Sequence, residues 1–290
     1  MRRFIKIVEK LKWLGLLGLP IFISDNSIWK MLWLFWLFGI LELLLKLPLT
    51  IQSFEQLLSM LIIPIIDNPL PSLENYRGKI KYSLPLKGNW VVVNGGVTKD
   101  FSHSWSINSQ RYAYDFIKLD KNGKSYSGDK MNLNSYYCYN EDILAPADGL
   151  VVKVYNNQKY SSIMQNNGTD PLIKHLAGNH IVIKHNNNEY SFLAHLKQNS
   201  ITVKENEEVK RGQKIALCGN SGNTTEPHLH FQIQNRKSFI FSSGIPICFK
   251  DLEIADTVNY NVYDDRALPK EKTYNDSCQY IYRAQTVSNK

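Results

Sequence analysis

The sequence predicts an all-β domain of mostly antiparallel sheets, preceded by an α-helical region that associates with a membrane. Long apolar runs fill residues 1–66, turn residues dominate 67–80, and short β-rich runs separated by Gly, Asn and Pro follow. A chain of 290 residues exceeds the usual size of one compact core, which favours this division. We therefore expect helices in 1–66, a linker in 67–80, the main domain in 81–240 and a C-terminal extension without an assigned role in 241–290.

Three apolar segments lie in the first region, at 13–24, 28–45 and 57–66. The first follows a basic start and has no small-residue cleavage site after it, so we expect it to stay attached. The second is the best transmembrane helix, because its apolar surface has no polar face. The third contains Pro64 and is interfacial, re-entrant or part of another span. The number of spans stays open.

The basic residues at the start of the chain bear on its orientation. They are Arg2, Arg3, Lys6, Lys10 and Lys12. Such a cluster favours an N-terminus on the cytoplasmic side, and an odd number of spans would then place the rest outside. We therefore expect a protein of the cell membrane with an extracytoplasmic domain.

The main domain shows the pattern of strands and turns. The β-rich runs occupy residues 90–93, 149–155, 180–184, 190–193, 214–217 and 229–233. No long amphipathic helical pattern interrupts them, which indicates antiparallel sheets. The stretch 155–178 is polar and irregular and is expected to be an inserted surface loop.

The net charge limits the classes of binding partner, and the cysteine spacing limits the kinds of metal site and disulfide. The formal net charge of +8 suits anionic partners, but no dense run of Lys and Arg with interleaved aromatics occurs after residue 100, so we expect no nucleic-acid partner. The four cysteines are Cys138, Cys218, Cys248 and Cys278, and none forms a Cys-x-x-Cys pair. This spacing argues against a structural zinc knuckle. One or two disulfides and four buried thiols remain alternatives.

A His-x-His pair is the strongest chemical signal in the domain. On a strand, His228 and His230 share one face and enter one pocket. Imidazole is a preferred zinc ligand, and His195 lies among apolar residues where an unpaired ionisable group is costly to bury. Together with Asp115 these residues supply ligands and a neighbouring acid or base for a catalytic zinc site.

At this point the sequence resembles the lysostaphin-type zinc metallopeptidases, which cut peptide bonds in peptidoglycan. The resemblance covers about residues 85 to 235, and its ordered set is more specific than each motif alone. After Asp115, the matching motifs are Ile-Leu-Ala-Pro-Ala-Asp-Gly at 143–149, Gly-Asn-His-Ile-Val-Ile at 178–183, Ala-His-Leu at 194–196, Val-Lys-Arg-Gly-Gln-Lys-Ile at 209–215, Gly-Asn-Ser-Gly at 219–222 and His-Leu-His-Phe at 228–231.

The resemblance implies a β-sheet peptidase with a groove over the sheet, Zn²⁺ as cofactor and a peptidoglycan peptide as substrate. It implies that Asp115 and His230 ligate the metal, while His195 and His228 orient water, relay protons or stabilise the oxyanion. A zinc ion there would act as a Lewis acid and lower the pKa of water to about 7.

Arg111 departs from the family pattern, which has a His ligand four residues before the Asp. Arginine stays protonated and cannot coordinate zinc. Either another residue replaces the ligand or the site has lost its metal. We favour His103 as the replacement, because the other histidines and Asp115 are retained. Arg111 then binds a substrate carboxylate or contacts the ligand residues without touching the metal.

Other interpretations compete with the enzyme. A lysostaphin-like domain without catalysis could bind wall peptides or regulate a membrane partner, and Arg111 favours it. A function centred on the membrane segments is a third alternative. The motifs at 143–149 and 209–215 also resemble lipoyl and biotinyl carrier domains, but that hypothesis does not explain His-x-His. No role is expected for His175, His180 and His185.

Overall fold

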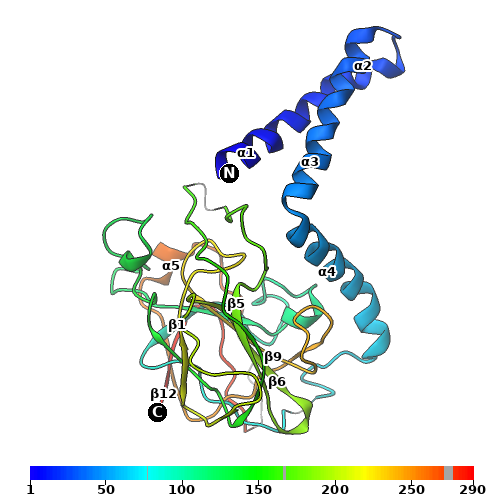
Figure 1. Ribbon diagram of the computed structural model, residues 1–290. Coiled ribbons are helices and arrows are strands. Elements are labelled where there is room, and N and C mark those ends of the chain that lie inside the picture. Colours follow the sequence, from blue (N-terminus) through cyan, green and yellow to red (C-terminus); the bar gives the residue numbers. More distant parts are fainter. Residues whose placement is uncertain (77, 166–167, 271–276) are drawn as a thin grey trace.

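The computed structural model describes residues 1–76, 78–165, 168–270 and 277–290. It consists of a β domain and an N-terminal helical region that projects from one end of it (Figure 1). The strands pair in antiparallel fashion throughout the two named sheets. The predicted fold class, an antiparallel β domain preceded by apolar helices, is confirmed.

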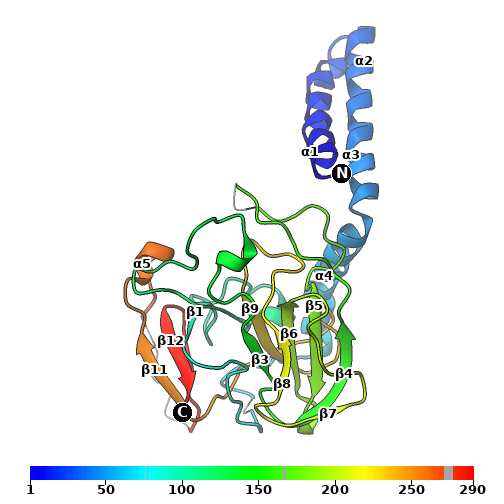
Figure 2. The same ribbon diagram turned by 60° about the vertical axis from the view of Figure 1, so that its left-hand side comes forward.

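The first 45 residues form a helical hairpin, here called the N-terminal hairpin. Its outgoing arm consists of α1 (Arg2–Leu11) and the 3₁₀ helix η1 (Lys12–Phe22), and its returning arm of α2 (Ser27–Trp33), η2 (Leu34–Trp36) and α3 (Leu37–Leu45). Figure 2 shows the two arms side by side and antiparallel. Asn26 starts the returning arm, since its side chain accepts a hydrogen bond from the backbone N–H of Ile28.

The two arms pack closely because small residues face aromatic ones. A Cβ atom on Gly15 would lie 2.8 Å from the indole of Trp36, and one on Gly18 would lie 2.6 Å from the indole of Trp33. Trp33 also donates its indole N–H to the Gly18 carbonyl at 2.9 Å. Glycine therefore permits an approach that any side chain would block.

Helix α4 (Leu47–Ile66) follows directly and lies against the β domain. The sequence predicted a shorter third segment at 57–66, whereas the helix has 20 residues with Pro64 in its last turn. One side of the helix faces the β domain. Gln52 accepts a hydrogen bond from the Leu176 amide and donates one to the Lys174 carbonyl, and the Ser59 carbonyl accepts one from Asn108.

The main sheet has ten strands in the order β11-β12-β1-β2-β9-β6-β5-β4-β7, with β10 also paired to β9. The strands are β1 (Trp90–Asn94), β2 (Tyr114–Ile117), β4 (Gly149–Tyr155), β5 (Asn179–Lys184), β6 (Tyr190–Leu196), β7 (Glu208–Val209), β9 (Leu229–Gln234), β10 (Gly244–Ile245), β11 (Leu252–Asp256) and β12 (Gln285–Asn289). Strands β3 (Asp142–Leu144) and β8 (Lys214–Leu217) form a second, two-stranded sheet. The core lies between the sheets, where alternate residues of β9 (Leu229, Phe231, Ile233) are fully buried.

The C-terminal segment, 241–290, supplies strands to the main sheet. Strand β12 pairs with β1 in antiparallel fashion, with Trp90 opposite Val287, and β11 pairs with β12. A short helix, α5 (Tyr260–Tyr263), lies between β11 and β12. A disulfide joins Cys248 to Cys278, whereas Cys138 and Cys218 are buried free thiols. One disulfide is therefore present among the alternatives that the sequence left open.

Candidate active site

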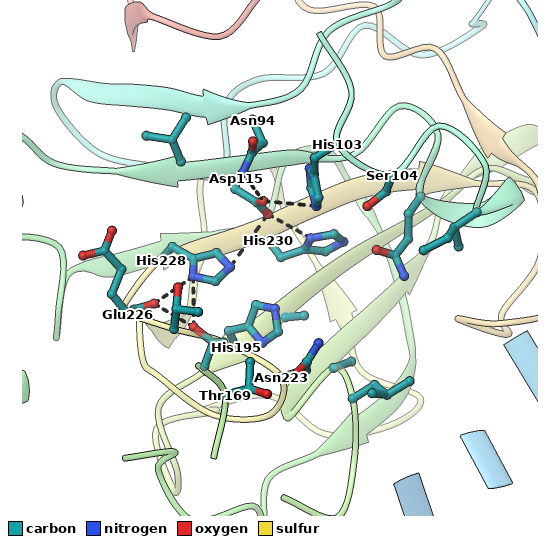
Figure 3. A pocket seen from close by; sticks show the side chains of 18 of the residues that line it. Asn94, His103, Ser104, Asp115, Thr169, His195, Asn223, Glu226, His228 and His230 are labelled. Carbon is teal, nitrogen blue, oxygen red and sulfur yellow. Dashed lines mark hydrogen bonds and ion pairs between the residues drawn. The ribbon is translucent and has the colours of Figure 1, made fainter. Parts of the chain in front are cut away.

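Three adjacent strands bring the predicted site residues together. Asp115 on β2 lies directly opposite His230 on β9, and His230 lies opposite Ala194 on β6, next to His195. Because neighbouring strands place opposed residues on the same face, Asp115 and His230 lie together over the sheet. His195 lines the same cleft. His228 precedes β9 by one residue and lies on the same face as His230 (Figure 3).

Asp115 is the centre of the cluster. Its Oδ1 lies 2.9 Å from His230 Nδ1 and 3.8 Å from His228 Nε2, and its Oδ2 lies 3.7 Å from His103 Nε2. The Asn94 side chain donates a hydrogen bond to Oδ2 at 3.1 Å. Figure 3 shows these groups converging on the carboxylate. The structure thus brings His103 within reach of Asp115, as expected for a replacement ligand, although its ligand role stays a proposal.

His195 and His228 each use one ring nitrogen to contact the backbone. The carbonyl of Ser221 lies 2.7 Å from His195 Nδ1, and that of Glu226 lies 2.9 Å from His228 Nδ1. A carbonyl only accepts, so both Nδ1 atoms carry a proton and both Nε2 atoms keep a lone pair. The rings lie close together, with centroids 4.6 Å apart. These lone pairs are the acceptors that a general base requires.

His195 adopts an unusual backbone conformation at this point. Its φ is +61°, in the left-handed region that a residue with a Cβ rarely adopts. The strand pairing between β5 and β6 is also irregular here, between Asn179 and Ile181. The backbone N–H of His195 donates to the Ala177 carbonyl at 3.1 Å, which holds this conformation. Strained residues of this kind cluster at functional sites.

A chain of hydrogen bonds along β9 fixes the orientation of His230. The Gln234 amide NH₂ donates to the backbone carbonyls of Arg236 (2.7 Å) and Ser238 (2.9 Å). Its oxygen must then face Gln232, whose NH₂ donates to it at 2.6 Å. The Gln232 oxygen lies 2.8 Å from His230 Nε2 and accepts its proton. We call His230, Gln232 and Gln234 the β9 polar chain.

This chain has a chemical consequence for His230. With Nε2 protonated, the Nδ1 lone pair points at the carboxylate of Asp115, which is also an acceptor. Two acceptors 2.9 Å apart need a cation between them, either a second proton on the imidazole or a metal ion. Both side chains are buried, so water cannot readily replace that cation.

The charges in the cleft shift several pKa values. Burial opposes ionisation of Asp115, yet the hydrogen bond with His230 and the nearby histidines hold its pKa far below the usual range. Burial also opposes protonation of His230, but Asp115 outweighs it and raises that pKa. Burial lowers the pKa values of His103 and His195. These two imidazoles are therefore neutral at pH 7, the form that ligates metal or accepts a proton.

The donor set fits a zinc ion. Two ligands of a tetrahedral zinc with bonds of about 2.0–2.1 Å have donor atoms about 3.3 Å apart. The Asp115–His230 separation of 2.9 Å and the Asp115–His103 separation of 3.7 Å lie on either side of that value. Within the described ranges, no group of three or more His, Cys, Asp or Glu side chains is placed so that it could hold a metal ion. Small side-chain rotations would be needed to form such a group.

The cleft has a volume of about 420 Å³, and its walls come from distant parts of the chain. Gln56 of α4, Thr169 and Leu176 of the loop 156–178, and Asn223 line it together with the histidines. Several of these side chains are visible in Figure 3. The helical region therefore supplies part of the cleft wall, which the sequence did not indicate.

Arg111 lies apart from this cleft. Its guanidinium Nε donates to the Trp105 carbonyl at 3.3 Å, and the group lies over the Trp105 ring, 5.1 Å from the centroid. Arg111 is absent from the described residues that line the cleft. In this arrangement it holds the turn that carries His103, and substrate binding by Arg111 stays an untested hypothesis.

Several contributors were missed from the sequence. Asn94, Gln232 and Gln234 contact Asp115 or His230 directly or through one neighbour. A signal for the glutamines was present, because polar residues at 230, 232 and 234 alternate with apolar ones at 229, 231 and 233. The remaining histidines lie elsewhere: His180 is on the inner strand β5, and His185 contacts Asp148 and Ser191.

Comparison with known proteins identifies part of the chain. Residues 134–241 match the model of Peptidase family M23. The match includes His195, His228 and His230 but begins after Asp115. Peptidoglycan DD-endopeptidase ShyB of Vibrio cholerae serotype O1 is 45% identical over 73 residues, which is 24% of this chain. The aligned part spans only 17% of that relative's length.

Solved structures to which this chain shows similarity include a zinc-containing peptidase from Vibrio cholerae and the catalytic domain of lysostaphin from Staphylococcus simulans. The first has 24% identity and a TM-score of 0.34, covering 58% of this chain and 41% of that chain. The second has 22% identity and a TM-score of 0.29, covering 59% of this chain and 90% of that chain.

Proposed function

We propose, from the premise that residues 134–241 form a peptidase family M23 domain, that this chain is a membrane-anchored zinc peptidase that hydrolyses peptide bonds in cell-wall peptidoglycan. The family match confirms the lysostaphin-type resemblance predicted from the motifs. The observation that carries the proposal is the convergence of His103, His228 and His230 on the buried carboxylate of Asp115. Such a set has little structural purpose without a cation.

In this proposal His103, Asp115 and His230 hold the zinc ion. When bound, zinc polarises the scissile carbonyl and lowers the pKa of water. The Nε2 lone pair of His195 or His228 accepts the proton of the attacking water. The other imidazole donates a hydrogen bond to the developing oxyanion, an interaction worth about 3–4 kcal/mol in such sites.

The two auxiliary histidines are prepared for these roles by their surroundings. Backbone carbonyls hold both Nδ1 protons, which leaves both Nε2 atoms free to face the cleft. His195 is buried and of lowered pKa, so it is an unprotonated acceptor at neutral pH. We assign the general base to His195. His228, which is more accessible and lies 3.8 Å from Asp115, takes the oxyanion role once protonated.

Membrane anchorage and an extracytoplasmic location belong to the same proposal. Two helices, Ser27–Leu45 and Leu47–Ile66, are long and apolar enough to cross a membrane by length and composition. The Cys248–Cys278 disulfide supports an oxidising compartment. Peptidoglycan is the partner that the family suggests, since ShyB carries the name of a peptidoglycan DD-endopeptidase.

A second function is favoured by one observation. Arg111 stands at the position of the family's first ligand, and it is bonded to Trp105 rather than to the cluster. A domain that cannot retain zinc would bind wall peptides in the same cleft without cutting them, or would regulate a membrane partner. The two functions differ in metal content and in hydrolysis.

The experiment measures both properties on the purified full-length chain. Elemental analysis after incubation with excess zinc and desalting should give about one zinc per chain. The same preparation should release peptides from purified peptidoglycan. His230→Ala should lose both properties, whereas His175→Ala, a histidine outside the cleft, should keep them. Zinc below about a tenth of an equivalent, with peptidoglycan bound but uncut, would support the binding module instead.

A further inference from the structure

The N-terminal hairpin has two chemically distinct ends. At the end near the β domain, Lys12 pairs with Glu42 at 2.6 Å, and Lys46 pairs with Glu9 and, at 3.1 Å, with Glu42. At the far end, where the arms connect, Asp25 pairs with Lys30. Figures 1 and 2 both place the N-terminus at the end near the β domain. The charged groups therefore flank an uncharged part of the hairpin that consists of 13–24 and 31–41.

Between these ends the hairpin carries no charged residue on either arm. Its outward side chains are large and apolar, and they are exposed: Trp13, Leu16, Leu17, Leu19, Leu34, Leu37 and Ile40. The polar contact inside this part is the indole-to-carbonyl hydrogen bond between Trp33 and Gly18, which faces the partner arm. An apolar surface of this size, with ion pairs only at its ends, matches a lipid bilayer.

The length of the hairpin agrees with a complete crossing. The returning arm, Ser27–Leu45, has 19 residues. At about 1.5 Å per residue it is about 28 Å long, close to the roughly 30 Å hydrocarbon core. Lys30 and Glu42 each lie about one helical turn inside the ends of this arm, so its uncharged stretch, 31–41, is about 17 Å long. From these positions long Lys side chains can extend to the headgroups.

The N-terminus is attached to the β domain. The guanidinium of Arg2 contacts both carboxylate oxygens of Asp170, at 3.0 Å and 2.8 Å. Asp170 is buried and also accepts hydrogen bonds from the amides of Ser162 and Leu172, in the loop that lines the cleft. A bidentate pair with a buried carboxylate is a specific contact. The first residues and the β domain therefore occupy the same aqueous phase.

From these observations we infer that the chain crosses the membrane twice through the N-terminal hairpin, so that the N-terminus and the β domain lie on the same side. The lipid bilayer occupies the apolar surface of the hairpin, and the connection at 23–26 reaches the opposite side. This topology does not depend on catalysis, so it stands or falls separately from the proposed function.

Helix α4 does not add a third crossing. Its polar residues contact the β domain, with Gln52 bonded to the loop at 174–176 and Ser59 to Asn108. Asp67, directly after the helix, pairs with Arg236 of the β domain. Its outward side chains Phe54, Leu57, Leu61 and Ile65 are exposed and apolar. The helix therefore lies at the membrane interface with its polar face on the enzyme.

An even number of crossings changes the expected orientation. A cytoplasmic N-terminus combined with an extracytoplasmic domain requires an odd number of membrane crossings. With two crossings, only one of these two expectations can be correct. If the domain faces the cell wall, the basic start faces it too. Arg2 and Lys12 are then neutralised by Asp170 and Glu42, and the remaining basic side chains face anionic headgroups.

Single-cysteine reporters in the full-length chain test the topology. Arg3→Cys reports the N-terminus, Ser24→Cys the far end of the hairpin, and Lys204→Cys the β domain; all three positions are exposed. The native cysteines should stay silent toward a membrane-impermeant maleimide, because two are buried and two form the disulfide. Spheroplasts expressing each variant are labelled before and after lysis, and Lys121→Cys serves as a second domain reporter.

The expected result is that Arg3→Cys and Lys204→Cys react fully in intact spheroplasts, whereas Ser24→Cys reacts only after lysis. Reaction of the N-terminal and domain reporters on opposite sides would overturn the inference, as would labelling of all three on one side. If both the N-terminal and domain reporters are protected until lysis while Ser24→Cys reacts in intact cells, the same-side topology holds and the extracytoplasmic location in the proposed function fails.

Discussion

Replacing Gln232 by Leu should weaken both zinc binding and the fold. The substitution removes the acceptor of the His230 Nε2 proton and the donor to the Gln234 oxygen, and Gln232 and Gln234 are fully buried. Each unsatisfied buried group costs about 1–3 kcal/mol, so we expect about 2–6 kcal/mol of destabilisation. Loss of such a supporting partner lowers metal affinity about 10- to 100-fold.

The reason for the loss of affinity is the tautomer. In the wild type, Gln232 keeps the proton on Nε2 and leaves Nδ1 to face Asp115. Without that acceptor the proton can move to Nδ1, where it donates to Asp115 and occupies the position of the metal. Nitrogen-15 NMR of the metal-free protein should therefore show His230 protonated on both ring nitrogens in the wild type and a larger share of the neutral Nδ1–H form in Gln232→Leu.

Ile233→Ala is the matched control, because Ile233 lies on the opposite, core-facing side of the same strand. It should destabilise the protein by about 2–5 kcal/mol through a cavity while leaving the imidazole contacts intact. Zinc affinity is measured by competition with a chelator, and stability by denaturant unfolding of the metal-free protein. If Gln232→Leu bound zinc within about twofold of wild type, or if Ile233→Ala lost as much affinity, the β9 polar chain would have no specific role.

Three further outcomes are expected. His228→Ala should keep zinc but lower kcat about 10²- to 10⁴-fold, which zinc analysis and peptidoglycan digestion of one preparation would check. His103→Ala should reduce zinc affinity more than about 100-fold in a chelator titration, whereas Ser106→Ala on the same loop should not; equal affinities would end the ligand proposal. Contacts with Arg236 lower the pKa of Asp67 to about 2. Since this is below the ~3.9 of an unfolded Asp, the stabilisation is present above pH ~4 and is lost as the pH falls toward ~2, so Asp67→Asn should be less stable by about 1–3 kcal/mol at neutral pH in urea unfolding and approach wild type in acid.

The spacing of His228 and His230 along the chain was sufficient to predict that their side chains share one face. A spacing of two on a strand places His228 and His230 on one face whatever the rest of the fold does. The order of the motifs then indicated which distant residues join them. Asp115 does lie opposite His230, as a shared site requires. Their roles as ligands remain predictions.

Long-range pairing could not be predicted in the same way. Strand β12 lies beside β1 although Val287 and Trp90 are far apart in sequence. The pattern of polar and apolar residues in this five-residue strand is too short to identify β1 as its neighbour. The sequence therefore assigns no role to the C-terminal segment. Helix α4 was underestimated for a different reason. Its polar residues Gln52, Gln56 and Ser59 recur at helical spacing, but Gln52 and Gln56 precede the apolar segment 57–66, and hydrophobicity alone does not extend the helix to include them.

Helix α4 also limits how this protein can change over evolutionary time. A helical region that made no contact with the cleft could be exchanged for another segment without affecting the site. Here Gln56 lines the cleft and Gln52 holds the loop beside it, so recombination that replaced the first 66 residues would leave the cleft open on one side. The helical region and the β domain must therefore be inherited as one unit, and truncations intended to keep the cleft intact should begin before Leu47.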